Sequence, residues 1–376
     1  GGPMKHSSDR RRPRPPILAG LLLLAALPAA AQDPPQEAFA GEVTVSEVAL
    51  DVVVTDARGR VVVGLDRDDF RVKEDGRPVE LSEVVFYSHR ELMEEAISAD
   101  ELNVDTDLLA HRYFILLFHD QRQLAATLAA RQLDAARWAK RWVRTELGPR
   151  DLVAVFSYQY GLRPQIDFSN DRDAIASAID HAIVSQETHP SRLPAADAGM
   201  PSLLASLASP EELARETTTI YDALEKLAGA ADAVGGRKNL VLFSIGFDSE
   251  TDDTFFRPDP RYFPRVVQAM NDANLAAYAV DLAPSAARGD AVSRQRGNSL
   301  SYLATETGGR HFSNYVNVAT PLSEIEEATG GYYLLTYRSR RPAGESGYQR
   351  VDVELVNPGF TARAREGYLY GGGSGG

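Results

Sequence analysis

Short apolar runs alternate with amphipathic stretches between residues 111 and 330, and this alternation constrains the fold more than any other feature of the chain. Each run has the length of a strand, and its continuous apolar character is typical of a strand buried on both faces of a parallel sheet. The stretches between the runs have the apolar spacing of helices. The runs are YFILLF (113–118), DLVAVFSY (151–158), NLVLFSIG (239–246) and AAYAVDL (276–282). This order predicts a doubly wound, mostly parallel α/β domain over residues 111–330.

The two flanks of this domain have β character. Residues 43–90 alternate apolar and polar positions, and Asp75-Gly76 within them is a strong turn signal between two strands. Residues 331–370 return to strand-like runs. Neither flank has enough strands to be stable alone, so we expect them to pack together as one small β domain that carries the α/β domain as an insertion. The charged residues 91–110 are predicted to be a linker.

The first residues have the layout of a secretory signal peptide. A basic stretch is followed by an apolar core, ILAGLLLLAAL, and by Ala29 and Ala31, which fit a small-x-small cleavage site. The apolar core is too short to span a bilayer as a helix. Residues 4–31 are therefore predicted to be a signal peptide, and the mature chain to be periplasmic or secreted, with no membrane span. The terminal GGGSGG, residues 371–376, is interpreted as a linker or tag.

Composition narrows the classes of partner. The chain has no cysteine, so a disulfide, a lipid-bearing cysteine and a thiol nucleophile are excluded. The net charge is −13, and removal of the predicted signal peptide, which carries five basic residues and one acidic residue, brings it to −17. Such a charge repels nucleic acid and anionic membrane surfaces. We therefore expect no nucleic-acid partner, and cations or basic partners are favoured.

Several segments, in this order, resemble pieces of a von Willebrand factor type A domain. The pieces are YFILLFHD, DLVAVFSY, GLRPQIDFSNDRDAI, TTTIYDALEKLA, GRKNLVLFSIGFD, LAAYAVDL and LATETGGRHF. The flanks VVVTDARGRVVVGLDRDDFRVKEDGRPV and GGYYLLTYRS resemble the ends of bacterial secreted proteins related to this family. The resemblance implies a doubly wound sheet that mediates protein–protein adhesion. It also implies a Mg²⁺ site at the carboxyl edge of the sheet, built from an Asp-x-Ser-x-Ser run, a Thr and a second Asp.

The first loop of that implied site lacks the hydroxyl groups of the family pattern. Taking Asp120 as the aspartate places Arg122 at the first serine position, whereas taking His119 as the aspartate places Gln121 and Gln123 at the two serine positions. An arginine would bring a fixed cation into the space of the metal. The sequence therefore predicts a degenerate site without a cofactor. Mg²⁺ held by Asp120 and Thr218 is the alternative.

The other two loops match the pattern in part. Thr218 is the counterpart of the family threonine, and Thr217 or Thr218 can also be interpreted as the cap of the following helix. In the third loop Ile245 occupies the aspartate position, with Asp248 three residues further on. For Asp120 three roles stay open: a helix cap, a partner of Arg122, or a metal ligand. The candidate partner-binding edge consists of His119, Asp120, Arg122, Thr218 and Asp248.

The most favoured function is that of an exported protein–protein interaction module of the adhesion type. The chain contains none of the G-x-S-x-G, H-E-x-x-H or glycine-rich phosphate motifs, so it is not predicted to be an enzyme. Two alternatives stay open: a structural component of an envelope or secreted assembly, and a hydrolase that uses His119 and Asp120. The segment 184–213, rich in Pro, Ser and Ala, is predicted to be a long surface excursion.

Overall fold

The fold is known from a computed structural model, which describes residues 46–88, 111–121, 126–184, 200–247, 258–283, 291–339 and 346–370. All of them belong to one compact unit, Val43–Gly376. The predicted signal peptide (4–31), linker (91–110) and C-terminal tag (371–376) lie outside the described residues, as do Arg122 and Asp248.

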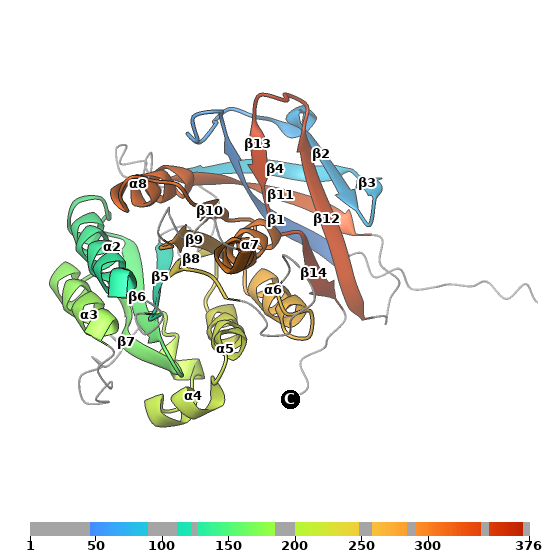
Figure 1. The fold of residues 1–376 in the computed structure, drawn as a ribbon. Helices are drawn as coiled ribbons and strands as arrows, with labels where there is room; N and C mark the ends of the chain where they lie inside the picture. The colour runs from blue at the N-terminus through green and yellow to red at the C-terminus, as the bar shows by residue number, and fades with distance from the viewer. Residues whose placement is uncertain are drawn as a thin grey trace, which may run out of the picture. The chain divides into compact units, whose positions relative to one another are not determined.

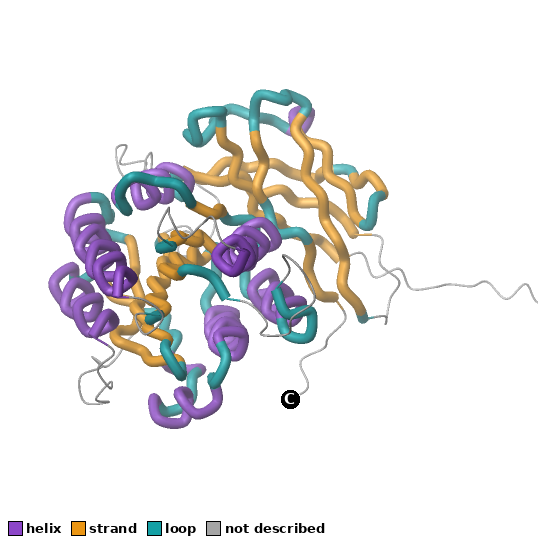
Figure 2. The backbone as a smooth tube through the Cα atoms, in the orientation of Figure 1, coloured by secondary structure: helices purple, strands orange, loops and turns teal. Residues whose placement is uncertain are grey.

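A six-stranded sheet forms the centre of the α/β part (Figures 1 and 2). Its strands are β5 (Arg112–His119), β6 (Asp151–Tyr158), β7 (Leu162–Ser169), β8 (Lys238–Ser244), β9 (Leu275–Asp281) and β10 (Arg310–Phe312). The spatial order is β10-β9-β8-β5-β6-β7, and only β7 runs antiparallel to its neighbour. Counted from β5 as the first strand, this is the doubly wound order 3-2-1-4-5-6. The predicted fold class is confirmed.

Helices cover both faces of this sheet (Figure 1). They are α2 (Ala126–Thr145), α3 (Arg172–Val184), α4 (Pro210–Glu216), α5 (Ile220–Asp232), α6 (Phe263–Asp272), α7 (Ala291–Glu306) and α8 (Ala319–Ala328). Successive side chains of β5 point to opposite faces, so Phe114 packs in one core layer with α2, α3 and α8, and Ile115 in the other with α5 and α6. Both layers exclude water, which explains why the central strands are apolar without alternation. No helix within the described ranges is both long and apolar enough to cross a bilayer.

The two flanks form a sandwich of two four-stranded antiparallel sheets, ordered β13-β1-β11-β4 and β14-β12-β2-β3. The strands are β1 (Ser46–Thr55), β2 (Phe70–Glu74), β3 (Arg77–Val79), β4 (Leu81–Ser88), β11 (Gly331–Ser339), β12 (Gly347–Leu355), β13 (Thr361–Arg363) and β14 (Gly367–Tyr370). A short 3-10 turn (Arg67–Asp69) precedes β2. Each sheet contains strands from both flanks, as β1 pairs with β11 and β2 with β12. The prediction that the two flanks pack together is confirmed.

A single buried carboxylate joins the two sheets of the sandwich. Glu74 on β2 accepts hydrogen bonds from the hydroxyls of Tyr337 (3.3 Å) and Ser339 (3.0 Å) on β11 and from Tyr368 on β14. The tight turn between β2 and β3 is made by Asp75 and Gly76, both with positive φ, as the sequence predicts. The hydrogen bonds from Tyr337 and Ser339 to Glu74 therefore link the two sheets, in addition to the apolar core between them.

Part of the predicted surface excursion is instead packed against the sheet. Leu203 and Leu213 are fully buried in the core layer that contains α5. The segment is held by Asp167 on β7, whose carboxylate accepts hydrogen bonds from the Ser202 hydroxyl (2.6 Å) and from the backbone N–H of Leu203 (3.0 Å) and Leu204 (3.3 Å). The prediction for residues 184–213 is therefore wrong where these contacts lie, and residues 185–199 are outside the described part.

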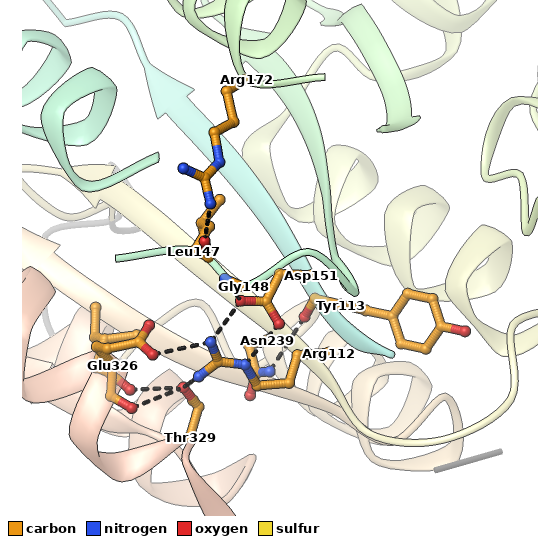
Figure 3. Close-up of polar contacts among 10 residues, drawn as sticks. Arg112, Tyr113, Leu147, Gly148, Asp151, Arg172, Asn239, Glu326 and Thr329 are labelled. Atoms are coloured by element: carbon orange, nitrogen blue, oxygen red, sulfur yellow. Dashed lines mark hydrogen bonds and ion pairs between the residues drawn. The ribbon is translucent and has the colours of Figure 1, made fainter. Parts of the chain in front are cut away.

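The amino edge of the sheet is closed by buried ions (Figure 3). Arg112, the first residue of β5, donates to both carboxylate oxygens of Asp151, the first residue of β6, at 2.8 and 2.5 Å. The same guanidinium pairs with Glu326 of α8 at 2.9 Å. One cation thus ties two strands and a helix together at this edge.

Candidate functional site

The carboxyl edge of the sheet has its topological switch point between β5 and β8. In open α/β sheets, ligands bind in the crevice at this point, because the chain leaves the two neighbouring strands in opposite directions. The predicted residues His119 and Asp120 stand at the end of β5, and Ser244 ends β8 beside them. This is the edge where the resemblance places a Mg²⁺ site.

The Gln121 side chain cross-links the two loops at this point. Its Nε2 donates to the carbonyl of Gly246 (2.9 Å), and its Oε1 accepts from the backbone N–H of Ile245 (2.9 Å) and from the Ser244 hydroxyl (3.2 Å). A backbone donor and a backbone acceptor together fix which way the amide is turned. Gly246 has φ +100°, a conformation that favours glycine, so its backbone can face the amide without strain.

His119 is part of the same network. Its Nδ1 lies 2.9 Å from the Ser244 hydroxyl, which also accepts the N–H of Gly246 at 3.0 Å. The imidazole packs edge-on against the ring of Tyr158, with 5.3 Å between centroids, and the backbone carbonyl of His119 accepts from Gln132 (2.7 Å). The Ser244 hydroxyl donates its hydrogen bond to Gln121 Oε1. In that arrangement it accepts from His119, so Nδ1 of the imidazole carries the hydrogen.

The second loop is tied to the same edge through Tyr158. The hydroxyl of Tyr158 donates to the backbone carbonyl of Thr218 (3.0 Å). The backbone carbonyl of Tyr158 accepts the N–H of Asp120 (2.7 Å). Burial, aided by the charge of Asp222, raises the pKa of Tyr158, so the hydroxyl stays a donor at physiological pH. The predicted residues His119, Asp120 and Thr218 are thus brought to one edge.

The cap of α5 is neither of the predicted threonines. Thr219 is the N-cap, and it forms a reciprocal capping box with Asp222: the Thr219 hydroxyl accepts the N–H of Asp222 (3.1 Å), and the Asp222 carboxylate accepts the N–H of Thr219 (3.0 Å). The Thr217 hydroxyl instead donates to the backbone carbonyl of Leu213 (2.6 Å) and accepts the backbone N–H of Leu162 (2.7 Å). Thr218 is exposed. Its side chain is therefore available at the rim.

The rim of this edge also carries an exposed aromatic residue. Tyr160, in the turn between β6 and β7, is 70% exposed. The next residue, Gly161, lies against α4 so closely that a Cβ there would come within 2.4 Å of the Ala214 carbonyl oxygen. Tyr160 and Thr218 are therefore held on neighbouring, tightly packed backbones.

The described residues at this edge do not fit a Mg²⁺ ion. Mg²⁺ requires about six oxygen ligands in octahedral geometry. His119 offers nitrogen, the Gln121 oxygen already accepts two hydrogen bonds, and the buried Ile245 occupies the position of the third-loop aspartate. Within the ranges described above, no three His, Cys, Asp or Glu side chains are grouped so that they could hold a metal. Arg122 and Asp248 lie outside those ranges. The two other roles predicted for Asp120, a helix cap and a partner of Arg122, both involve residues in the segment 122–125 that is not described, so they stay predictions.

Sequence reasoning missed the central role of Gln121 and the supporting roles of Ser244 and Tyr158. The available signal was the register that starts at His119, which places Gln121 at the first serine position of the family pattern. The absence of a hydroxyl there indicates only that a metal ligand is lost. It does not indicate that an amide, which both donates and accepts, joins the two loops instead.

Several solved structures are similar to this chain. Human Sec24c matches 68% of this chain and 43% of its own length, with 11% identity and a TM-score of 0.37. A von Willebrand factor type A protein from Catenulispora acidiphila matches 82% of this chain and 74% of its own length, with 11% identity and a TM-score of 0.33. Proximal thread matrix protein 1 from the mussel byssus, described with a zinc-occupied MIDAS motif, matches 58% and 48%, with 11% identity and a TM-score of 0.33.

The chain spans less than half the length of the Sec24c and mussel structures. No protein family model and no curated protein sequence matches the chain. The fold class follows from the strand order of the six-stranded sheet, with its single antiparallel strand β7 beside β6. The α/β part therefore has a doubly wound, mostly parallel α/β fold.

Proposed function

We propose that this chain is an exported protein-interaction module that binds its partner at the carboxyl edge of the six-stranded sheet without a metal ion. The observation that carries the proposal is the Gln121 side chain, which joins the β5 and β8 loops through hydrogen bonds to Ile245 and Gly246. A preformed edge costs less conformational entropy on binding than one that must be ordered by the partner.

The exposed residues of the rim support a protein ligand. Tyr160 and Thr218 face solvent while the backbones that carry them are fixed by Gly161 and by the Tyr158 hydroxyl. Tyrosine is enriched at protein interfaces because its ring gives a large contact area and its hydroxyl a hydrogen bond. The mature charge of −17 favours a partner with a basic surface.

Metal independence is tested by thermal unfolding of the mature protein with millimolar Mg²⁺, Mn²⁺ or Ca²⁺ and with EDTA. A ligand that binds only the folded state must raise the melting temperature by mass action. We expect equal melting temperatures in all four conditions. A rise with one ion that disappears in Asp120→Ala would restore the metal-dependent adhesion site and refute this part of the proposal.

Partner binding is tested with a photo-crosslinking amino acid placed at Thr218 or Tyr160, and, as a matched control, at the exposed Leu133 on α2. The proteins would be exposed to the extracellular and envelope fractions of the source cells. We expect the same adduct from Thr218 and Tyr160, none from Leu133, and no effect of EDTA. Equal adducts from all three positions would instead favour a structural component without a dedicated edge.

Export is tested by the N-terminal sequence of the protein recovered from outside the cytoplasm. Cleavage after the small residues that end at Ala31 would leave Gln32 as the first residue. An unprocessed chain that stays in the cytoplasm would contradict the export part of the proposal and leave the interaction part standing.

A hydrolase that uses His119 is the second candidate, because His119 lies within hydrogen-bond distance of Ser244. A nucleophile must reach its substrate, and Ser244 is 0% exposed, with its hydroxyl engaged by Gln121 and by Gly246. This arrangement supports a structural role for the pair. Labelling of Ser244 by a fluorophosphonate probe, lost in Ser244→Ala, would favour the hydrolase.

A further inference from the structure

A cleft of about 640 Å³ lies between the β sandwich and the end of α7, away from the carboxyl edge. Its walls are β12, β13 with the residues that follow it, and the turn between α7 and β10; these elements can be followed in Figure 1. The volume is in the range of sites that hold small molecules. Nothing in the proposed function uses this cleft.

The cleft is basic although the chain as a whole is acidic. Four basic side chains line it, against two acidic ones. The basic residues are Lys73, Arg350, Arg363 and Arg365, and the acidic ones are Asp352 and Glu366. Two of the four cations are paired with Glu354 and Glu366, so the positive charge that can attract a small anion here is that of Arg363 and Arg365.

The four basic side chains differ in how their charge is balanced. Lys73 pairs with Glu354 at 2.6 Å, and Arg350 pairs with Glu366 at 2.9 Å. Arg365 donates from its two terminal nitrogens to the backbone carbonyls of Asn271 and Ala49, both at 3.0 Å, which does not neutralise its charge, and its buried Nε has no hydrogen-bond partner in the part of the chain that the structure describes.

Arg363 has the least compensation. Among the described residues its one hydrogen-bond partner is the hydroxyl of Thr55 (3.1 Å), and it makes no ion pair. Burial, together with the nearby guanidinium of Arg310, lowers the pKa of Arg363, since both disfavour its charged form. A guanidinium with several free N–H groups in a cleft is suited to a carboxylate or phosphate oxygen.

The wall opposite β12 is rigid. Gly308 has φ +71°, and a Cβ there would come within 2.6 Å of the backbone of Ala364. A Cβ at Gly309 would come within 2.0 Å of the Ala277 carbonyl oxygen. The backbone that follows Arg363 is therefore packed directly on the α7–β10 turn, which holds the side chains of this wall in place.

We propose that this cleft binds a small oxyanion, a phosphate or carboxylate group, with Arg363 as its main ligand and Arg350 and Lys73 at its mouth. Both acidic residues of the lining lie beside a basic one. Asp352 is the neighbour of Lys73 on the adjacent strand, and Glu366 is paired with Arg350. Burial, with the adjacent Glu366, raises the pKa of Glu306 to about 7, so this neighbouring carboxyl is partly protonated at neutral pH.

The proposal is tested by isothermal titration calorimetry of the full chain with inorganic phosphate and, separately, with succinate, at constant ionic strength. Because a charge-assisted hydrogen bond contributes strongly to binding, we expect Arg363→Met to lower the affinity for the anion about tenfold or more. The matched control is Arg144→Met, which removes the same charge on α2, where Arg144 is 56% exposed.

A second pair of variants keeps the test valid if Arg363→Met unfolds the protein. Thr361 is exposed and lines the cleft, so Thr361→Glu adds a negative charge without disturbing the core, and Thr361→Gln is its neutral counterpart. We expect Thr361→Glu to abolish binding and Thr361→Gln to retain it. Binding of phosphate alone or succinate alone would identify the group. No binding of either anion, or equal binding by Thr361→Glu, would overturn the proposal.

Discussion

At the amino ends of β5 and β6 an ion cluster cross-links the sheet, whereas at the carboxyl ends of β5 and β8 the neutral side chain of Gln121 cross-links the two loops. Arg112 joins Asp151 and Glu326 at the first edge, and Gln121 joins Ser244, Ile245 and Gly246 at the second. Both cross-links span residues that are far apart in the sequence. They differ in what remains when one partner is removed.

A buried ion whose partner is lost keeps its charge in a medium of low polarity, and this costs several kcal/mol. A buried amide whose partner is lost leaves unsatisfied dipoles, which cost less. We infer that the amino edge contributes more to stability, and that the carboxyl edge is the one that can change without unfolding the protein. This fits the placement of ligand sites at carboxyl edges of α/β sheets.

Arg112→Met is expected to have the largest effect. It leaves the buried carboxylate of Asp151 and the partly buried carboxylate of Glu326 without their cation, and the loss in free energy of unfolding should be about 3–5 kcal/mol. Urea unfolding monitored by circular dichroism measures it, with Arg144→Met as the control, expected to change stability by less than about 0.5 kcal/mol. A loss of less than about 1 kcal/mol in the free energy of unfolding would show that the ion pairs of Arg112 do not hold this edge together.

Gln121→Leu keeps the volume of the side chain and removes its hydrogen bonds. The N–H of Ile245 and the carbonyl of Gly246 then lose their partner, and the expected loss is about 2–3 kcal/mol. The same urea titration tests it beside Gln132→Leu, which leaves the His119 carbonyl without its hydrogen bond to the side chain. Equal stability of wild type and Gln121→Leu would contradict the cross-link.

Lys238→Met is expected to stabilise the protein. Lys238 begins β8 at the amino edge, donates to the Val234 carbonyl (2.6 Å), and burial lowers its pKa from 10.5 to about 8. The folded state therefore binds the proton less tightly than the unfolded state, so stability rises as pH increases from about 8 to 10.5. At pH 7 the burial of this charge costs about 3 kcal/mol, of which the hydrogen bond recovers about 1, so methionine should gain about 2 kcal/mol.

The measurement for Lys238 is urea unfolding at pH 7, 9 and 10 in wild type and Lys238→Met, with the exposed Lys226→Met as control. Tyrosines also titrate at high pH, so the difference between the two proteins isolates Lys238. The wild-type curve should approach that of Lys238→Met as pH rises. Parallel curves would mean that Lys238 titrates alike in the folded and unfolded states.

Thr218→Ala should have the smallest effect on stability, less than about 0.5 kcal/mol, because only the backbone carbonyl of this exposed residue is used. Its neighbour Thr219 is the matched comparison, since Thr219→Ala removes the cap of α5 and should cost about 1 kcal/mol. If the carboxyl edge binds the partner, Thr218→Ala should weaken crosslinking from Tyr160 while Thr219→Ala, at equal folded fraction, should not.

The elements that the sequence predicted best are those whose pattern reflects burial on both faces. The four apolar runs correspond to β5, β6, β8 and β9. Burial of apolar side chains on both faces accounts for these strands, and these apolar side chains need no polar partner from elsewhere in the chain. The strand β7 was missed because it contains Gln165 and Asp167, which are buried. Their partners, Ser157 and the backbone of residues 203–204, become adjacent only in the folded chain.

The amino-acid sequence by itself determined the doubly wound α/β fold and the pairing of the two flanks, and it placed His119 and Asp120 at the end of a central strand. Periodicity and strand ends are local properties, and burial of apolar surface acts on them directly. The tertiary structure alone decided that Gln121 joins two loops, that Thr219 caps α5 and that four basic residues meet in one cleft. Hydrogen bonds and ion pairs depend on short distances between groups remote in the chain, and no local pattern fixes those distances.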